Sequence, residues 1–227
     1  MLRPVRQPYA LFAIAVGLVG LGLDFIVILG TMAPPQSRSL PNVLVYYWTF
    51  LTNLSNLGLL CIYLVTLTRW RALGWFRHPV NIAGMGGIML LVMGFYHFML
   101  APALPPLPLA IEISNVLLHY VTPVLFLVWW AAFAPHGGLR IRDVPVMLVP
   151  GLGYVGWVML RGPLAGEYPY AILDPGFAPP GGTPAGYAGV ALSVGVLVVL
   201  VALCDLLLVA LDGFIARWRR AAEGVGR

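Results

Sequence analysis

Polar side chains with helical spacing occur in two places of an otherwise apolar sequence. They are Thr49, Thr52, Ser55 and Asn56, with Asn53 beside them, and Glu112, Asn115 and His119. Residues three or four apart share one face of a helix, so each group is expected to form a polar stripe. A hydroxyl is a weak nucleophile that needs a proton acceptor within reach, and an imidazole can supply one. Thr52 and His119 are therefore candidates for the nucleophile and the base of an acyl transfer.

The composition excludes a soluble globular protein as the setting for this chemistry. Of the 227 residues, 60% are hydrophobic and only 9% are charged, whereas a soluble domain has roughly 25% charged residues. The two cysteines, Cys61 and Cys204, lie in apolar runs, so neither a disulfide framework nor a cysteine metal cluster is expected. The composition therefore predicts a membrane protein.

Six apolar stretches are long enough to cross a bilayer, since a membrane helix needs about 20 such residues. The predicted spans are Pro8–Met32, Val43–Thr68, Val80–Leu100, Leu109–Ala134, Val144–Leu160 and Tyr187–Phe214. The fifth carries Pro145 and Pro150, which membrane helices tolerate. We expect an all-α fold, a polytopic membrane helical bundle with six transmembrane helices that forms one domain over residues 1–227.

The basic residues, all of them arginine, are distributed unevenly between the two sides of this bundle and give the chain a net charge of +5. One side, that of the N-terminus, has Arg3, Arg6, Arg69, Arg71, Arg77, Arg140, Arg142, Arg217, Arg219, Arg220 and Arg227. Only Arg38 and Arg161 fall on the other side. The positive-inside rule then places both termini in the cytoplasm. The use of arginine without lysine suggests a bacterial chain, and hence a bacterial cytoplasmic membrane.

Three further polar residues are expected near the cytoplasmic side. Asp205 and Asp212 lie near the inner end of the sixth span, where we expect them to pair with the arginines. His136 lies in a predicted cytoplasmic loop and is expected to be solvated.

Estimated depths bring several polar groups together in the outer half of the bundle. At a rise of 1.5 Å per residue, Thr52 lies roughly 13 Å and His119 roughly 15 Å below the outer surface. Asp24 lies roughly 10 Å below this surface, and Tyr96 and His97 roughly 5 Å. Ionisable groups are costly in a bilayer, so those present usually face the bundle interior and mark function.

An acyl transfer also needs a group that orients the base and hydrogen-bond donors for the oxyanion. The candidates by depth and chemistry are Asp24, Asn53, Asn56, Tyr96, His97, Glu112 and Asn115. The sequence lacks the H-E-x-x-H, G-x-S-x-G and Walker A motifs, and no G-x-G-x-x-G segment follows a predicted strand. We expect no metal and no cofactor.

Three segments carry a resemblance to a known family. They are YWTFLTNLSN at 47–56, NVLLHYVTPV at 115–124 and EYPYAILD at 167–174. Together they resemble the androgen-induced-gene family of six-span membrane proteins. This family includes hydrolases that cleave fatty acid esters of hydroxy fatty acids with an intramembrane threonine and histidine.

The resemblance implies a lipid-ester hydrolase in which Thr52 is the nucleophile and His119 is the catalytic histidine. The segment 167–174 matches a family motif in the last outer loop. There, Tyr168, Tyr170 and Asp174 would form a lid or bind the substrate. The expected partner is a lipid ester that enters from the bilayer, and nucleic acid is not expected.

Two functions from other classes remain open. Polar stripes hold membrane helices together, so the same residues suit a non-catalytic lipid-binding or structural membrane protein. A solute carrier would use the cluster as a binding site near the midplane, although the sequence shows no internal repeat.

Overall fold

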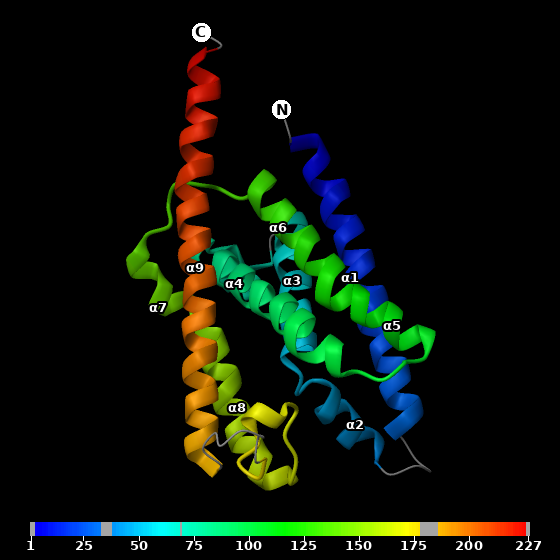
Figure 1. Ribbon diagram of the computed structural model, residues 1–227. Coiled ribbons are helices and arrows are strands. Elements are labelled where there is room, and N and C mark those ends of the chain that lie inside the picture. Colours follow the sequence, from blue (N-terminus) through cyan, green and yellow to red (C-terminus); the bar gives the residue numbers. More distant parts are fainter. Residues whose placement is uncertain (1–2, 33–37, 69, 178–185, 226–227) are drawn as a thin grey trace.

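The computed structural model describes residues 3–32, 38–68, 70–177 and 186–225, which form helices and connecting loops with no strand among them (Figure 1). Arg69 and Arg227, two of the arginines used to predict the orientation, lie outside these described residues. The predicted all-α fold is therefore confirmed for the part of the chain that the structure describes.

Among the described residues, five helical stretches are long and apolar enough to cross a membrane. They are α1 (Arg3–Met32), α4 (Pro79–Phe95) with its continuation to Ala103, α5 (Leu109–Val116) running into α6 (Thr122–Phe133), α7 (Val144–Met147) followed by α8 (Val149–Ala165), and α9 (Gly186–Val225). The remaining predicted span, Val43–Thr68, consists of two shorter helices. These are α2 (Leu40–Tyr47) and α3 (Leu51–Leu67), which are bent by 75° relative to each other. The prediction of one continuous helix here is wrong.

Side chains from elsewhere in the bundle satisfy the carbonyl groups that this break leaves without helical partners. The Asn53 side-chain amide donates to the Tyr47 carbonyl oxygen at 3.0 Å, and the Tyr154 hydroxyl donates to the Thr49 carbonyl oxygen at 3.0 Å. A broken helix is tolerated at membrane depth when its backbone groups find such partners. The sequence shows no proline or glycine at the break, so the usual signals of a helix end were absent.

Two helices widen into a π-helical turn near their middle or end. One is η2 (Tyr96–Leu100), which continues α4, and the other is η4 (Leu117–Val121), which joins α5 to α6. In η4 the Thr122 N–H donates to the carbonyl of Leu117, five residues back instead of four. Turns of this kind are rare and occur frequently at functional sites.

The last two spans are longer than predicted. Helix α8 continues through Arg161 to Ala165 and ends at Gly166, whose φ of +67° suits glycine. Helix α9 continues past Phe214 to Val225. The remaining short helical turns are η1 (Arg71–Arg77), η3 (Ala101–Ala103), η5 (Ile141–Asp143) and η6 (Ala171–Leu173).

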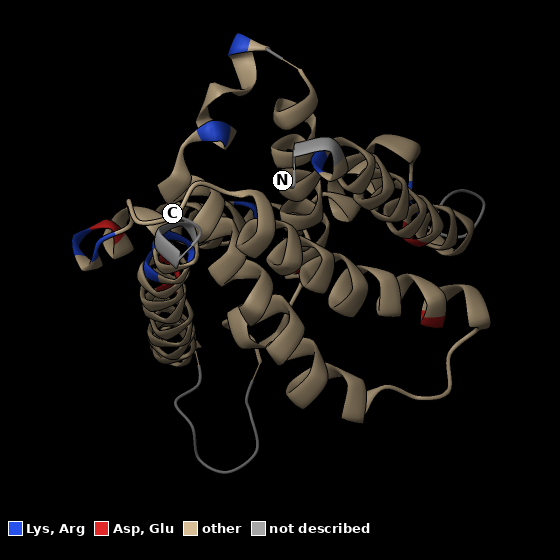
Figure 2. Ribbon diagram, turned by 90° about the horizontal axis from the view of Figure 1, so that it is seen from above, with Lys and Arg blue, Asp and Glu red and all other residues tan. Residues whose placement is uncertain are grey.

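The start of α1 and the end of α9 lie at the same end of the bundle (Figure 1). Seen from there, arginines lie on several of the segments around this end (Figure 2). We call it the arginine-rich end; among its residues are Arg6, Arg71, Arg77, Arg140, Arg142, Arg217, Arg219 and Arg220. Helix α2 and the loop after α8 lie at the opposite end (Figure 1).

Two predictions about polar residues on this side are wrong. Asp212 pairs with His136, whose Nδ1 lies 2.9 Å from Asp212 Oδ1, and both side chains are buried. The backbone N–H groups of Gly137 and Leu139 also donate to Asp212. Asp205 is fully buried, and its carboxyl oxygens have no partner among the described residues. Helix packing has therefore taken both aspartates out of reach of the arginines.

Glycine allows two helical backbones to approach closely at one point of the packing. A Cβ atom on Gly84 of α4 would lie 3.0 Å from both the Cα atom and the carbonyl oxygen of Met147 in α7. A Cβ atom on Gly94 of the same helix would meet nothing within 4 Å. Of these two glycines, only Gly84 thus lies where a side chain would not fit.

We expect Gly84→Ala to lower the free energy of unfolding by about 1–3 kcal/mol, because the added methyl group would push against backbone atoms that no rotamer change can move. Gly94→Ala is the control and is expected to be neutral or slightly stabilising, since alanine favours the helix over glycine. Thermal unfolding of both variants in the same detergent checks this. Equal stability of the two variants would contradict the close contact of α4 and α7.

Candidate active site

The structure brings Thr52 and His119 into direct contact. The distance between Thr52 Oγ1 and His119 Nε2 is 3.2 Å. Thr52 lies in the first turn of α3, immediately after the break, and His119 lies at the centre of the π-helical turn η4. Each residue is only 8% exposed. A hydroxyl and an imidazole thus meet inside the bundle at two irregular points of its backbone.

The second nitrogen of His119 determines which ring nitrogen can act as the base. His119 Nδ1 lies 3.0 Å from the carbonyl oxygen of Asn115, to which only a protonated nitrogen can donate. A neutral ring then has no proton on Nε2, so this nitrogen accepts the Thr52 hydroxyl proton. The backbone of Asn115 therefore orients the imidazole, and the structure shows no such contact from either of the candidate carboxylates, Asp24 and Glu112.

Asn56 connects the two helices that carry the pair. Its side-chain amide donates to the carbonyl oxygens of Thr52 at 2.8 Å and Leu118 at 3.2 Å, and its oxygen accepts the Thr122 hydroxyl at 2.5 Å. Both amide protons are used in these bonds. Asn56 therefore holds Thr52 and His119 in register, and it has no proton left for an oxyanion.

Asp24 and Asn53 stabilise the break between α2 and α3. The Asn53 amide donates to Asp24 Oδ2 at 3.1 Å as well as to the Tyr47 carbonyl. Both protons of this amide are thus also committed within the protein. The polar stripe on α3 is consequently divided between one residue that contacts His119 and several that fix the backbone around it.

The two candidates from the π-helical turn of α4 have different surroundings. The ring of Tyr96 stacks on the imidazole of His119, with 4.0 Å between centroids and 20° between planes. His97 is exposed, and its Nδ1 lies 3.1 Å from the Tyr120 hydroxyl. Tyr96 therefore fixes the ring plane of the base, whereas His97 and the exposed Glu112 lie away from the pair.

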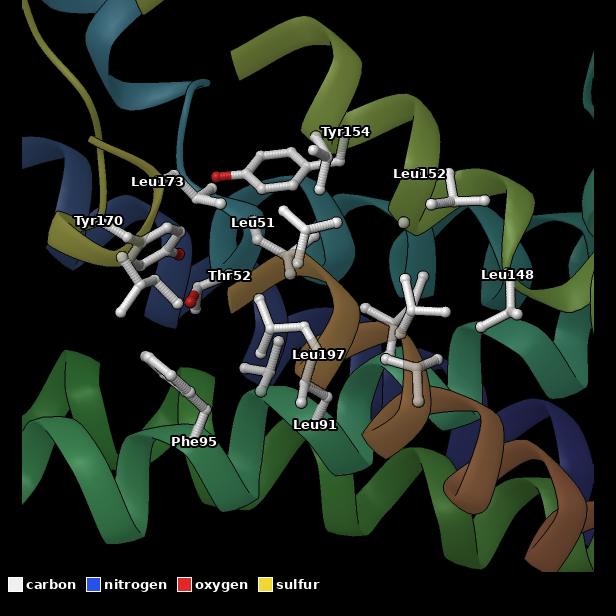
Figure 3. A pocket seen from close by; sticks show the side chains of 18 of the residues that line it. Leu51, Thr52, Leu91, Phe95, Leu148, Leu152, Tyr154, Tyr170, Leu173 and Leu197 are labelled. Atoms are coloured by element: carbon white, nitrogen blue, oxygen red, sulfur yellow. The ribbon is translucent and has the colours of Figure 1, made fainter. Parts of the chain in front are cut away.

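Of the three residues predicted for the lid, Tyr170 is the one that reaches the pair. Its hydroxyl lies beside the Thr52 hydroxyl and close to the backbone N–H groups at the start of α3 (Figure 3). Burial raises the pKa of Tyr170, so the hydroxyl keeps its proton at neutral pH. Tyr168 packs beside Gly162, and Asp174 accepts the N–H of Gly176 in its own loop.

The loop that carries Tyr170 is anchored by a carboxylate between two arginines. Glu167 accepts both terminal nitrogens of Arg38, at 2.8 and 2.5 Å, and one terminal nitrogen of Arg161 at 2.5 Å. These are the two arginines that the sequence places away from the other eleven. The hydrogen bond from Arg38, ahead of the other charge effects, lowers the pKa of Glu167 to about 2.

Thr52, His119 and Tyr170 lie where two cavities meet. One cavity, of about 80 Å³, is lined by apolar side chains of α4, α8 and α9, including Leu91, Leu152 and Leu197 (Figure 3). The other, of about 470 Å³, opens on the other side of the pair and is also lined by Asp24, Asn53 and Asn115. A group bound at Thr52 would thus have an apolar cavity on one side and a more polar cavity on the other.

Two residues that support the site were missed in the sequence. Thr122 holds Asn56, and it could have been found because it continues the stripe of Asn115 and His119 at the next helical step. Tyr154, which satisfies the Thr49 carbonyl, stands alone in an apolar segment and gave no such signal.

Within the described residues, no three His, Cys, Asp or Glu side chains gather in a way that could hold a metal ion. Comparison of the chain with known protein families, with curated proteins and with solved structures gives no match. The argument for the site therefore depends on its geometry.

The low pKa of Glu167 predicts a pH-dependent anchor. Because the pKa is about 2 in the folded protein, below the ordinary value of 4.5, the pair contributes its full stability above about pH 4.5 and loses it as the pH falls towards 2. We expect Glu167→Gln to cost about 1 kcal/mol at pH 7, since the carboxylate is partly exposed. The difference from the wild type should shrink below pH 4.5. Thermal unfolding across this range measures it.

Glu112→Gln is the control for this measurement, because Glu112 is exposed. A constant gap between Glu167→Gln and the wild type at all pH values would contradict the assignment of Glu167 as a charged anchor.

Proposed function

We propose that this protein is an integral-membrane hydrolase of lipid carboxylic esters that uses Thr52 as its nucleophile and His119 as its base. The observation that carries the proposal is the 3.2 Å contact between Thr52 Oγ1 and the His119 nitrogen that is free to accept a proton. The resemblance of three segments to the androgen-induced-gene family supports it and points to esters of fatty acids as substrates.

In the first half of the reaction, His119 Nε2 takes the Thr52 hydroxyl proton while Thr52 Oγ1 attacks the ester carbonyl carbon. The tetrahedral intermediate collapses, the bond to the alcohol oxygen breaks, and the alcohol leaves with the proton from His119. The acyl group is now bound to Thr52 as an ester.

In the second half, His119 takes a proton from water while the water oxygen attacks the acyl carbon on Thr52. The carboxylic acid is released, and Thr52 Oγ1 takes back a proton from His119. Each half passes through an oxyanion, whose stabilisation is usually the largest catalytic contribution. The donors nearest to Thr52 are the Tyr170 hydroxyl and the N–H groups at the start of α3.

The two cavities suggest how the substrate is divided at the site. The acyl chain would enter the apolar cavity between α4, α8 and α9, and the alcohol portion and water would occupy the more polar one. At about 80 Å³ the apolar cavity is smaller than the roughly 300 Å³ at which ligand pockets begin. Binding a long chain therefore requires the surrounding leucine and valine side chains to move apart.

The same proposal includes an orientation in the membrane. Helices α2 and α3 together form one broken span, which makes six crossings with both termini in the cytoplasm. The arginine-rich end then faces the inside of a bacterial cytoplasmic membrane. The lid and the cavity mouth face outwards, so substrate would arrive from the outer leaflet.

We expect Thr52→Ala and His119→Ala to lower the rate of ester hydrolysis by roughly 10³-fold or more, because each removes one partner of the reacting pair. Ser55→Ala and His97→Ala are the controls: the Ser55 hydroxyl bonds its own helix backbone, and His97 is exposed. Release of fatty acid from a fluorogenic lipid ester by purified protein measures the rate. Mass spectrometry after labelling with a fluorophosphonate should place the adduct on Thr52.

Labelling or hydrolysis that persists in a folded Thr52→Ala variant would overturn the proposed nucleophile. In that case the polar cluster would be attributed to helix packing or to lipid binding without catalysis.

A pair of glycines on α8 tests the place of the acyl chain. Gly151 lines the apolar cavity, and a Cβ atom there or on Gly153 would meet nothing within 4 Å. We expect Gly151→Leu to slow hydrolysis of long-chain esters about tenfold while short-chain esters react as before, because the new side chain fills the cavity. Gly153→Leu, on the exposed side of the helix, should leave both rates unchanged. An equal loss for both chain lengths would contradict this placement.

A further inference from the structure

A further hollow lies at the arginine-rich end, and it shares no lining residue with the two cavities at Thr52 and His119. It has a volume of about 950 Å³ and is surrounded by the first turns of α1, the end of α6, η1 and the end of α9. Three of its lining residues are Arg6, Arg77 and Arg219, and none of the described lining residues is acidic. The hollow is thus positively charged.

Contacts with neutral groups hold these arginines in place. One terminal nitrogen of Arg219 donates to the carbonyls of Ala131 at 2.7 Å and Ala132 at 2.8 Å, at the end of α6. Arg77 donates to the Thr68 carbonyl at 2.9 Å, and the Arg6 guanidinium lies 5.9 Å from the ring centre of Trp129. The salt bridges of the described residues involve none of the three. Their charges are therefore positioned, and no described carboxylate neutralises them.

Buried donors without partners lie next to the hollow. Trp129 lines the hollow and is 1% exposed, yet its indole N–H has no hydrogen-bond partner among the described residues. The Nε of Arg6 and the hydroxyl of Tyr63, whose ring lies 5.6 Å from that of Trp129, are also without partners. An unpaired buried donor costs about 1–3 kcal/mol. These three atoms are buried, so a ligand in the hollow would meet the terminal nitrogens of the arginines instead.

Phosphate is the acceptor that fits these donors best. A guanidinium presents several N–H groups in a plane that matches phosphate oxygens, and such charged hydrogen bonds are among the strongest in proteins. The hollow lies among helix ends, where lipid headgroups gather, and basic pockets between membrane helices bind anionic headgroups. Its walls include Phe76, Phe133 and Trp218, which suit the apolar part of a lipid.

We propose that this hollow binds the phosphate group of an anionic membrane lipid. The phosphate oxygens accept hydrogen bonds from the terminal nitrogens of Arg6 and Arg77, and the acyl chains extend along the aromatic wall into the bilayer. The site is separate from Thr52 and His119, so its occupancy does not depend on the hydrolase reaction.

Native mass spectrometry of the full-length, delipidated protein with added phosphatidylglycerol or phosphatidylcholine tests the site. We expect the wild type to retain one phosphatidylglycerol in preference to phosphatidylcholine. The Arg6→Gln/Arg77→Gln variant should bind it about tenfold more weakly, because it loses two charged donors. Arg71→Gln/Arg142→Gln removes the same charge from exposed positions outside the hollow and should bind like the wild type.

Two outcomes would contradict the proposal, one for the place of the site and one for the identity of the ligand. Equal binding by the two double variants would overturn the site. Protection by millimolar inorganic phosphate, with no preference for phosphatidylglycerol, would overturn the assignment to a lipid.

Discussion

Backbone N–H and C=O groups at membrane depth must find partners inside the protein, and this constraint determines how the candidate site can be built. The helical segment 40–67 is interrupted at residues 48–50, which frees the carbonyls of Tyr47 and Thr49. Asn53 and Tyr154 supply the missing donors. Because these bonds hold the break open, Thr52 stands in the first turn of a helix, with backbone N–H groups beside it. A continuous helix would bury those N–H groups in its own hydrogen bonds.

The part of the site around His119 depends on the same need of backbone groups for hydrogen-bond partners. The π-helical turn around His119 places the imidazole against the Asn115 carbonyl, and this contact leaves Nε2 to face Thr52. Asn56 then joins the two irregular segments by bonding to both. Tyr96 covers the ring from the neighbouring π-helical turn. Polar residues that look equivalent in the sequence thus divide into two that contact each other, Thr52 and His119, and several that hold them in position.

The arginines at the two ends of the bundle differ in their partners. At the end near the lid, Arg38 and Arg161 share Glu167, so their charges are compensated and anchor the Tyr170 loop. At the arginine-rich end, Arg6, Arg77 and Arg219 border a hollow without a described carboxylate. Compensated arginines stabilise a protein segment, whereas uncompensated ones attract an anion. The same residue type therefore serves the fold at one end and the proposed lipid site at the other.

The sequence by itself determines that the chain forms apolar helices and that Thr52 and His119 lie on polar helical faces, because hydropathy and spacing are local properties. It also singles out Tyr170 through a short motif. Only the tertiary structure decides that the helix is broken between α2 and α3, that Asp212 meets His136, and that a backbone carbonyl orients the His119 ring. Those outcomes depend on partners such as Tyr154, more than a hundred residues away from Thr49. No local pattern encodes contacts between segments so far apart.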